Sequence, residues 1–188
     1  MKSVLISIRP KWVKKITSGK KTIEVRKSAP KEVPFKAYIY CSYGNDRENY
    51  MLGKQGKIIG DFICDEVEEF HEWELSPQGK FAEFEEERLE KFLSATCLSI
   101  AEVFRYRDNL PYCKPLYGWH ISDLKIYDKP KELSEFSKPC PVANRNCENC
   151  LSLGKPYTWD FDEKKGEIYC TRRVTRPPQS WQYVEELK

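Results

Sequence analysis

Three charged side chains within six residues form the most chemically informative pattern of this sequence. Lys21, Glu24 and Arg26 follow Gly19 in the segment Gly-Lys-Lys-Thr-Ile-Glu-Val-Arg. Glu24 and Arg26 are two residues apart, so in a strand their side chains project from the same face. An ammonium group, a carboxylate and a guanidinium held together can recognise the hydrogen-bonding edge of a nucleobase. An ion pair that only orders the fold is the alternative interpretation.

Lys21 and Glu24 are also candidate catalytic residues. A lysine whose pKa is lowered by partial burial and by a neighbouring cation such as Arg26 can act as a base or a nucleophile on an amide carbonyl. An ionised Glu24 opposes this effect, because a nearby anion favours the ammonium form of lysine. The same pattern therefore supports either binding or hydrolysis.

Four cysteines form a second pattern with possible chemistry, in the order Cys140-x6-Cys147-x2-Cys150 followed by Cys170. A C-x-x-C pair is the usual half of a structural zinc site, and four thiolates would complete tetrahedral Zn²⁺ coordination. Such a site would order a segment with little apolar core of its own. A redox pair and four unliganded thiols are the alternatives. We interpret the remaining cysteines as small apolar residues in or beside the core: Cys41, Cys64, Cys97 and Cys113.

The elements around the charged segment place it at a junction between a helix and a strand. Residues 3–8 alternate and are rich in branched side chains, which predicts a strand. Pro10 suits the first turn of a helix, and Gly19 suits its C-terminal cap. Residues 22–26 then predict a second strand with apolar residues on one face and polar residues on the other.

The rest of the chain predicts an α+β fold, a mixed β-barrel flanked by short helices. Ser99 begins a capping box and therefore a short helix. Further strands are expected at 36–42, 57–70 and 116–127, and an acidic helix at 82–94. We divide the chain into a barrel domain at 1–130, a Cys-rich insertion at 131–172 and a tail at 173–188 that packs back on the barrel.

Charge is distributed unevenly along the 188 residues, although the net charge is only +3. Residues 1–31 hold ten basic residues and one acid, whereas residues 61–90 hold twelve acids and two basic residues. A basic face at the start of the chain suits a polyanion, and two solvated faces that neutralise each other are the alternative. We find neither a membrane span nor a signal peptide in the sequence and expect a cytoplasmic location.

The charged segment resembles the signature G-x-K-x-x-E-x-R of the ASCH domain, a member of the PUA-like superfamily, and it stands between the first helix and the second strand as in that family. The segments 7–10, 38–42 and 118–121 also look like family features, so the resemblance covers about residues 1–130 and the closing tail. It implies a β-barrel fold whose cleft binds RNA.

The resemblance also implies a possible enzymatic activity. Some small bacterial members of the family are amidohydrolases that remove the acetyl group from N4-acetylcytidine. They need the motif lysine, which is Lys21 here, together with a threonine at the position of Glu24 and a distant glutamate. This sequence therefore matches the catalytic residues of those enzymes only in part. Glu24 stands in place of the threonine, and no residue of 61–90 can be matched to the distant glutamate.

The expected ligand is single-stranded RNA or a modified nucleoside, bound through Arg26, Arg9 and Lys20. Trp12, Trp119 and Tyr117 are aromatic residues that could offer stacking surfaces to an unpaired base, and we select Trp119 for this role. Trp12 falls on the apolar face of the first helix and is expected in the core. Deacylation of acylated cytidines through Lys21 is the second functional hypothesis. The third is a protein-interaction adaptor whose zinc-stapled residues 138–172 contact a partner.

Overall fold

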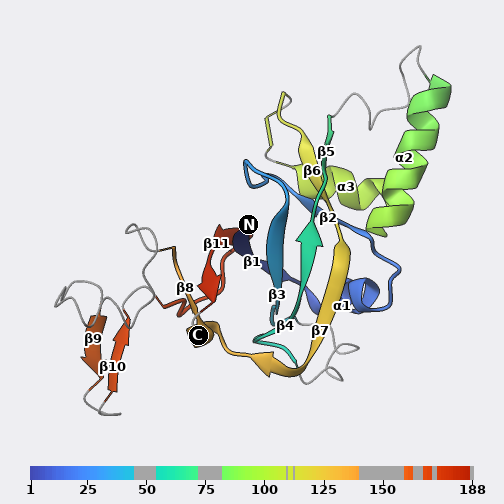
Figure 1. Cartoon of the computed structure of the whole chain (residues 1–188). Helices are drawn as coiled ribbons and strands as arrows, with labels where there is room; N and C mark the ends of the chain where they lie inside the picture. The colour runs from blue at the N-terminus through green and yellow to red at the C-terminus, as the bar shows by residue number, and fades with distance from the viewer. Residues whose placement is uncertain are drawn as a thin grey trace.

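The computed structural model describes residues 1–44, 54–71, 82–108, 110–111, 113–139, 159–162, 167–170 and 173–186. Three α-helices and twelve strands lie within these ranges (Figure 1). In chain order they are β1 (Lys2–Ile8), α1 (Pro10–Thr17), β2 (Ile23–Arg26), β3 (Phe35–Cys41), β4 (Lys57–Cys64), β5 (Val67–Phe70), α2 (Ala82–Thr96), α3 (Ile100–Arg107), β6 (Leu116–His120), β7 (Ser122–Lys131), a 3-10 helix (Leu133–Glu135), β8 (Phe136–Ser137), β9 (Trp159–Asp162), β10 (Glu167–Cys170), β11 (Trp181–Tyr183) and β12 (Glu185–Glu186).

The larger sheet has the strand order β11-β1-β3-β4-β7, and the smaller one has the order β2-β6-β5. Strands β1 and β3 run parallel, and every other pairing in the two sheets is antiparallel. Two short pairs, β12-β8 and β10-β9, complete the pattern. The described helices and strands thus form a mixed α+β fold with two main sheets and two short strand pairs. The sequence predicted a closed barrel, and the described strands do not form one.

Two segments that were each predicted as one long strand are divided between the two sheets. The segment 57–70 breaks after Cys64 into β4 and β5, and the segment 116–127 breaks at Ile121 into β6 and β7. The breaks lie beside each other, because the backbone N–H of His120 donates to the oxygen of Glu66 at 3.1 Å. Apolar residues continue on both sides of each break, so the sequence pattern does not reveal where the chain changes sheets.

The local signals at the helix ends agree with the structure. Gly19 follows α1 with a φ of +72°, in the left-handed region that glycine adopts without strain. Ser99 caps α3 by accepting a hydrogen bond from the backbone of Glu102, whose side chain accepts one from the Ser99 backbone. These two ends fix where α1 delivers the chain into β2 and where α3 begins.

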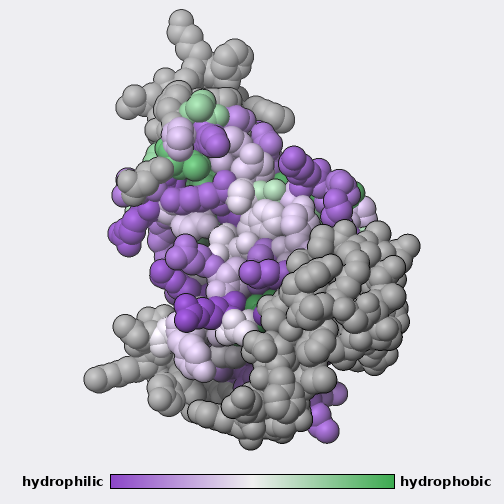
Figure 2. Space-filling model, turned by 90° about the vertical axis from the view of Figure 1, so that its left-hand side faces the viewer, coloured by the Kyte–Doolittle hydropathy of each residue, from purple (hydrophilic) through white to green (hydrophobic). Residues whose placement is uncertain are grey.

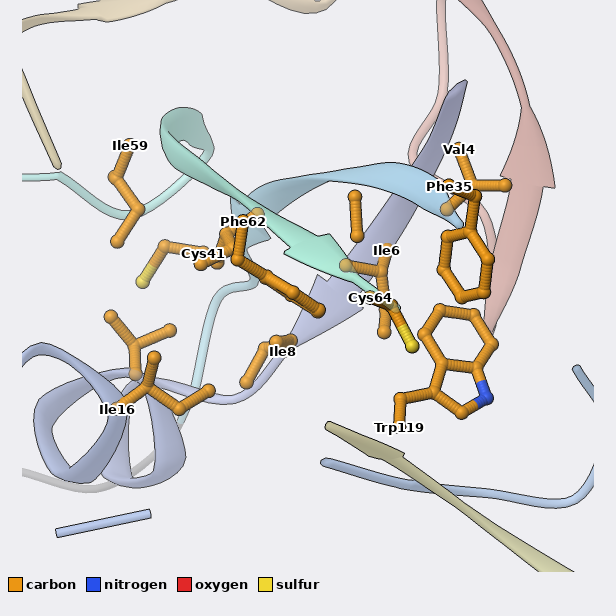
Figure 3. Packing of buried hydrophobic residues seen from close by; sticks show 13 residues of the cluster. Val4, Ile6, Ile8, Ile16, Phe35, Cys41, Ile59, Phe62, Cys64 and Trp119 are labelled. Atoms are coloured by element: carbon orange, nitrogen blue, oxygen red, sulfur yellow. The ribbon is translucent and has the colours of Figure 1, made fainter. Parts of the chain in front are cut away.

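The main core lies between the larger sheet, α1 and Trp119 of the smaller sheet (Figure 3). Phe62 belongs to this cluster together with Cys41 and Ile8, and Trp119 packs edge-to-face on Phe35 with 4.9 Å between ring centroids. The opposite face of the larger sheet packs on a second cluster that includes Phe136. A third cluster joins the smaller sheet to α2 and α3, so these helices are held over β2.

The described part of the face in Figure 2 is mostly hydrophilic, and its apolar residues form small patches. None of the helices among the described residues has the length and apolar composition that crossing a membrane requires.

Candidate functional site

The three charged side chains of the signature form one ion-paired group, which we call the motif triad (Lys21, Glu24 and Arg26). Glu24 lies at its centre, with Oε1 at 3.0 Å from Nη2 of Arg26 and Oε2 at 3.3 Å from Nζ of Lys21. Arg26 Nη2 also donates to the backbone oxygen of Ser7 in β1 at 2.7 Å. The side chains of Glu24 and Arg26 meet because alternate residues of β2 point to the same side.

The motif triad is almost completely buried, with 3%, 5% and 7% of the surfaces of Lys21, Glu24 and Arg26 exposed. Lys21 Nζ donates to the backbone oxygen of Thr96 at 2.9 Å and lies 5.3 Å from the ring centre of Trp12. Burial lowers the pKa of Lys21 below its usual value, and the negative charge of Glu24 opposes this effect. The lysine is thus held in a site that favours its neutral form more than water does.

The motif triad lines a cavity of about 550 Å³, which we call the motif cavity. Residues of β1, α1, β2 and α3 form its walls, and residues 177–180 of the tail complete them. The tail is fixed there by Ser7, whose Oγ donates to the oxygen of Pro178 at 2.6 Å and whose backbone N–H donates to the oxygen of Ser180 at 3.0 Å. The next residues form β11, which pairs with β1.

Two buried atoms of the motif triad lack a hydrogen-bond partner in the described part of the chain. These are Nε of Arg26, a donor, and Oε2 of Glu24, an acceptor that keeps only its ion pair with Lys21. A buried polar group without a hydrogen bond costs about 1–3 kcal/mol. The site therefore carries unused hydrogen-bonding capacity of both kinds.

Two aromatic residues line the motif cavity: Trp12, for which the sequence favoured a core position, and Tyr106, which the sequence did not identify. Trp12 is half-buried and lines the cavity, with the Nζ atoms of Lys11 and Lys15 at 4.2 and 4.9 Å from its ring centre. Tyr106 of α3 lines it as well, with 36% of its surface exposed. Burial raises the pKa of Tyr106, and the positive charges of Arg26 and Arg9 oppose this rise. Its phenol group therefore lies close to the motif triad, a contact between distant segments that local periodicity does not show.

The other predicted binding residues have different positions. Arg9 is exposed and lines the motif cavity, as a binding role requires. Lys20 is exposed but is not among the residues that line the cavity. The expectation that Trp119 offers a stacking surface is wrong, because this residue has no exposed surface and packs between Phe35 and Trp181 in the core.

The cysteines of the predicted zinc site fall almost wholly outside the described residues. Cys140, Cys147 and Cys150 lie there, and only the backbone of Cys170 is described, as the end of β10. The other cysteines were all expected in or beside the core. Cys41 and Cys64 are buried there, whereas Cys97 is half-buried and Cys113 is exposed in the connection between α3 and β6, which corrects that expectation for Cys113.

One further cluster of possible metal ligands is found among the described residues. Glu66, Glu68 and His120 each offer a ligand atom, and these atoms lie within 4.8 Å of one another. Nε2 of His120 is already 2.9 Å from a carboxylate oxygen of Glu68. Hydrogen bonding accounts for this arrangement without an ion.

The fold is similar to solved structures of ASCH proteins. The crystal structure of ASCH from Zymomonas mobilis gives a TM-score of 0.52 at 16% identity, covering 98% of this chain and 88% of that chain. Crystal structures of a tyrosine-to-phenylalanine and a serine-to-alanine variant of the Zymomonas mobilis protein give the same TM-score and identity, with 91% and 89% of those chains covered. At this identity the similarity shows the fold alone.

Comparison with curated proteins finds no significant match. The family model of the ASCH domain matches residues 6–156, which include the motif triad and most of the chain. The chain therefore belongs to the ASCH domain family and has its PUA-like fold.

Proposed function

We propose that the motif cavity binds one nucleobase, presented by single-stranded RNA or by a modified nucleoside. The convergence of the motif triad on a cavity of about 550 Å³ carries this proposal. Small-molecule sites usually have volumes of about 300–1,000 Å³, so the space suits a single nucleoside better than a stacked run of bases. After a small opening of the site, Nε of Arg26 could bind an acceptor of a base edge, and Oε2 of Glu24, which has only its ion pair with Lys21, could bind a donor.

The aromatic residues of the motif cavity support the same ligand class. Trp12 comes from α1 and Tyr106 from α3, so two different elements offer aromatic surface to one ligand. Stacking of an unpaired base on an aromatic side chain contributes about 1–3 kcal/mol per base. The basic residues next to Trp12 would add an attraction for phosphate that falls as salt concentration rises.

A titration of modified nucleosides and short RNAs, followed by tryptophan fluorescence, tests the proposal. Tyr106→Ala should weaken binding by about tenfold or more, since one stacking surface is lost. Phe104→Ala is the matched control, because Phe104 lies on the same helix, is 41% exposed and does not line the motif cavity. A wild-type protein that shows no saturable change with any ligand of the panel would disprove the proposal.

The lowered pKa of Lys21 supports a second candidate function, hydrolysis of the acyl group of an N4-acetylcytidine-type nucleoside. A neutral amine can act as the base or nucleophile that such an amide requires. The assay follows release of cytidine and acetate, which should disappear in Lys21→Met. Lys20→Met provides the control, because Lys20 is the adjacent exposed lysine and does not line the motif cavity. Absence of turnover in the wild-type protein would exclude the activity.

The cysteine pattern supports a structural zinc ion held by Cys140, Cys147, Cys150 and Cys170, within a segment (138–172) that can also serve as a contact surface for a protein partner. Metal analysis of the purified protein should find one zinc per chain. A pull-down that depends on residues 138–172 and is insensitive to Arg26→Ala would favour the adaptor function over binding in the motif cavity.

A further inference from the structure

We propose that the mouth of the motif cavity contains a phosphate subsite formed by Arg9, Arg105 and the N-terminus of α1. The ligand would then be a phosphorylated nucleoside rather than a neutral one. The inference rests on the proposed function, because the motif cavity would bind the base of the ligand and this subsite would bind its phosphate. Its phosphate can be a terminal monoester or the diester of an RNA chain.

The charges of the cavity wall identify the unneutralised groups. Within the motif triad the two cations share the carboxylate of Glu24. Lys11 is paired with Glu102 at 3.2 Å. Arg9 and Arg105 also line the cavity, and neither forms an ion pair with a described residue. The triad keeps one buried positive charge in excess, because its two cations share one carboxylate. The exposed excess of positive charge on the cavity wall is carried by the guanidinium groups of Arg9 and Arg105, a side chain well suited to bidentate phosphate binding.

The geometry brings these two arginines to the same opening from different elements. Arg9 is the N-cap residue of α1 and has no capping hydrogen bond from its side chain, and the first turn of the helix contains no acid. The positive end of the helix dipole is therefore not offset there, which favours an anion. The helix contributes this field rather than a set of donors, because Pro10 has no N–H and the N–H of Trp12 already donates to the oxygen of Arg9. Arg105 stands next to Tyr106 in α3, and the charge of Arg9 acts on the phenol of Tyr106. Both arginines therefore line the same cavity as Tyr106 and the motif triad.

A buried group independently indicates that the cavity is built for a ligand. Arg26 is 93% buried, lines the cavity and has no partner for its Nε–H within the described ranges. A ligand acceptor would satisfy this donor, so the inner part of the cavity suits the neutral, hydrogen-bonding base. The outer part, with its unpaired positive charge, suits the phosphate, whose charge near pH 7 is about −1.5 to −2 as a monoester.

The test compares the four ribonucleosides with their 5′-monophosphates and with dinucleotides that carry one internal phosphodiester. At low salt, the best monophosphate or dinucleotide should bind at least tenfold more tightly than its nucleoside, and added salt should reduce that advantage. Arg9→Gln combined with Arg105→Gln should remove the advantage, so that a nucleoside and its monophosphate bind the variant with equal affinity. Lys14→Gln is the control, because Lys14 is an exposed lysine of α1 outside the cavity lining.

The possible outcomes separate this inference from the proposed function. Equal binding of nucleosides and phosphorylated ligands would overturn the phosphate subsite and leave the base site intact. An advantage of phosphate that survives the double substitution, or that is lost equally in Lys14→Gln, would also overturn it. Failure of every nucleoside, nucleotide and dinucleotide to bind would overturn both proposals. A stronger effect for monophosphates than for dinucleotides would identify a terminal phosphate as the ligand group.

Discussion

Nζ of Lys21 donates a hydrogen bond of 2.9 Å to the backbone oxygen of Thr96, the last residue of α2. The last carbonyl groups of a helix have no partner within the helix and carry partial negative charge, so a cation is favoured there. The backbone N–H of Thr22 donates to the oxygen of Ala95 at 2.9 Å. The end of α2 therefore positions both the motif lysine and the start of β2.

The buried position of Lys21 predicts a pH-dependent stability. Its pKa is lowered by burial in the folded state, whereas the unfolded chain keeps the ordinary value of 10.5. Between these two values the unfolded state binds more protons, so the stability gained through Lys21 rises with pH. Urea unfolding measures the free energy of unfolding of the wild type and of Lys21→Met from pH 7 to pH 10. The value for the wild type should rise relative to that for the variant, by about 1.4 kcal/mol for each pH unit that separates the two pKa values of Lys21. A difference that does not change with pH would contradict the prediction.

Removing the carboxylate of Glu24 should strongly destabilise the fold. Glu24→Gln would leave the cations of Lys21 and Arg26 buried without their shared anion, and breaking a buried ion pair costs about 3–5 kcal/mol. Glu87→Gln is the comparison, because its pair with Lys91 is exposed and should contribute less than about 0.5 kcal/mol. Chemical denaturation measures both, and similar losses in the two variants would argue against an energetically important motif triad.

Substitution of Trp119 and of Trp12 should affect different properties of the protein, its stability in the first case and its ligand affinity in the second. Trp119→Ala removes a fully buried side chain and should cost about 3–5 kcal/mol of stability, with a smaller loss for Trp119→Phe. Trp12→Ala should affect ligand affinity more than stability, since Trp12 is half-buried and lines the motif cavity. Thermal unfolding and ligand titration of the three variants check this. Unchanged affinity in Trp12→Ala would show that Trp12 does not stack on the ligand.

Thiol reactivity should follow burial. Burial raises the pKa of Cys41 to about 11 and that of Cys64 to about 12, so both stay protonated and inaccessible at pH 8. Cys113 is exposed and should react readily with iodoacetamide in the native protein. Mass spectrometry of digested protein locates the labelled residues. Labelling of Cys41 or Cys64 before that of Cys113 would be inconsistent with the buried positions of these thiols.

Local signals in the sequence were sufficient to predict the elements that carry the motif. Pro10 and Gly19 bound α1 closely, and the two-residue spacing of Glu24 and Arg26 places both on one side of β2. Composition and alternation along the chain do not predict contacts between distant segments. Tyr106 and the tail residues 177–180 reach the motif cavity through the packing of α3 and β11, which no local pattern encodes.

The choice between the two tryptophans shows the same limit. Trp12 has helical spacing with core residues, yet it lies at the edge of α1, beside the cavity. Trp119 lies on a strand whose alternation leaves its inward face undecided, and the packing of the two sheets against each other places it inside. Which face of a strand becomes buried depends on the sheet that packs against it. The sequence of the strand alone does not identify that sheet.

Ser7 joins the two ends of the chain at the motif cavity, since it accepts a hydrogen bond from Arg26 and donates two to residues 178 and 180. Occupation of the cavity would therefore shift the opening equilibrium of β11. A molecule that binds only the closed arrangement stabilises it, and the stabilisation grows with ligand concentration and affinity. Amide protons in the ladder between β1 and β11 would report that coupling, exchanging with solvent more slowly as the site fills.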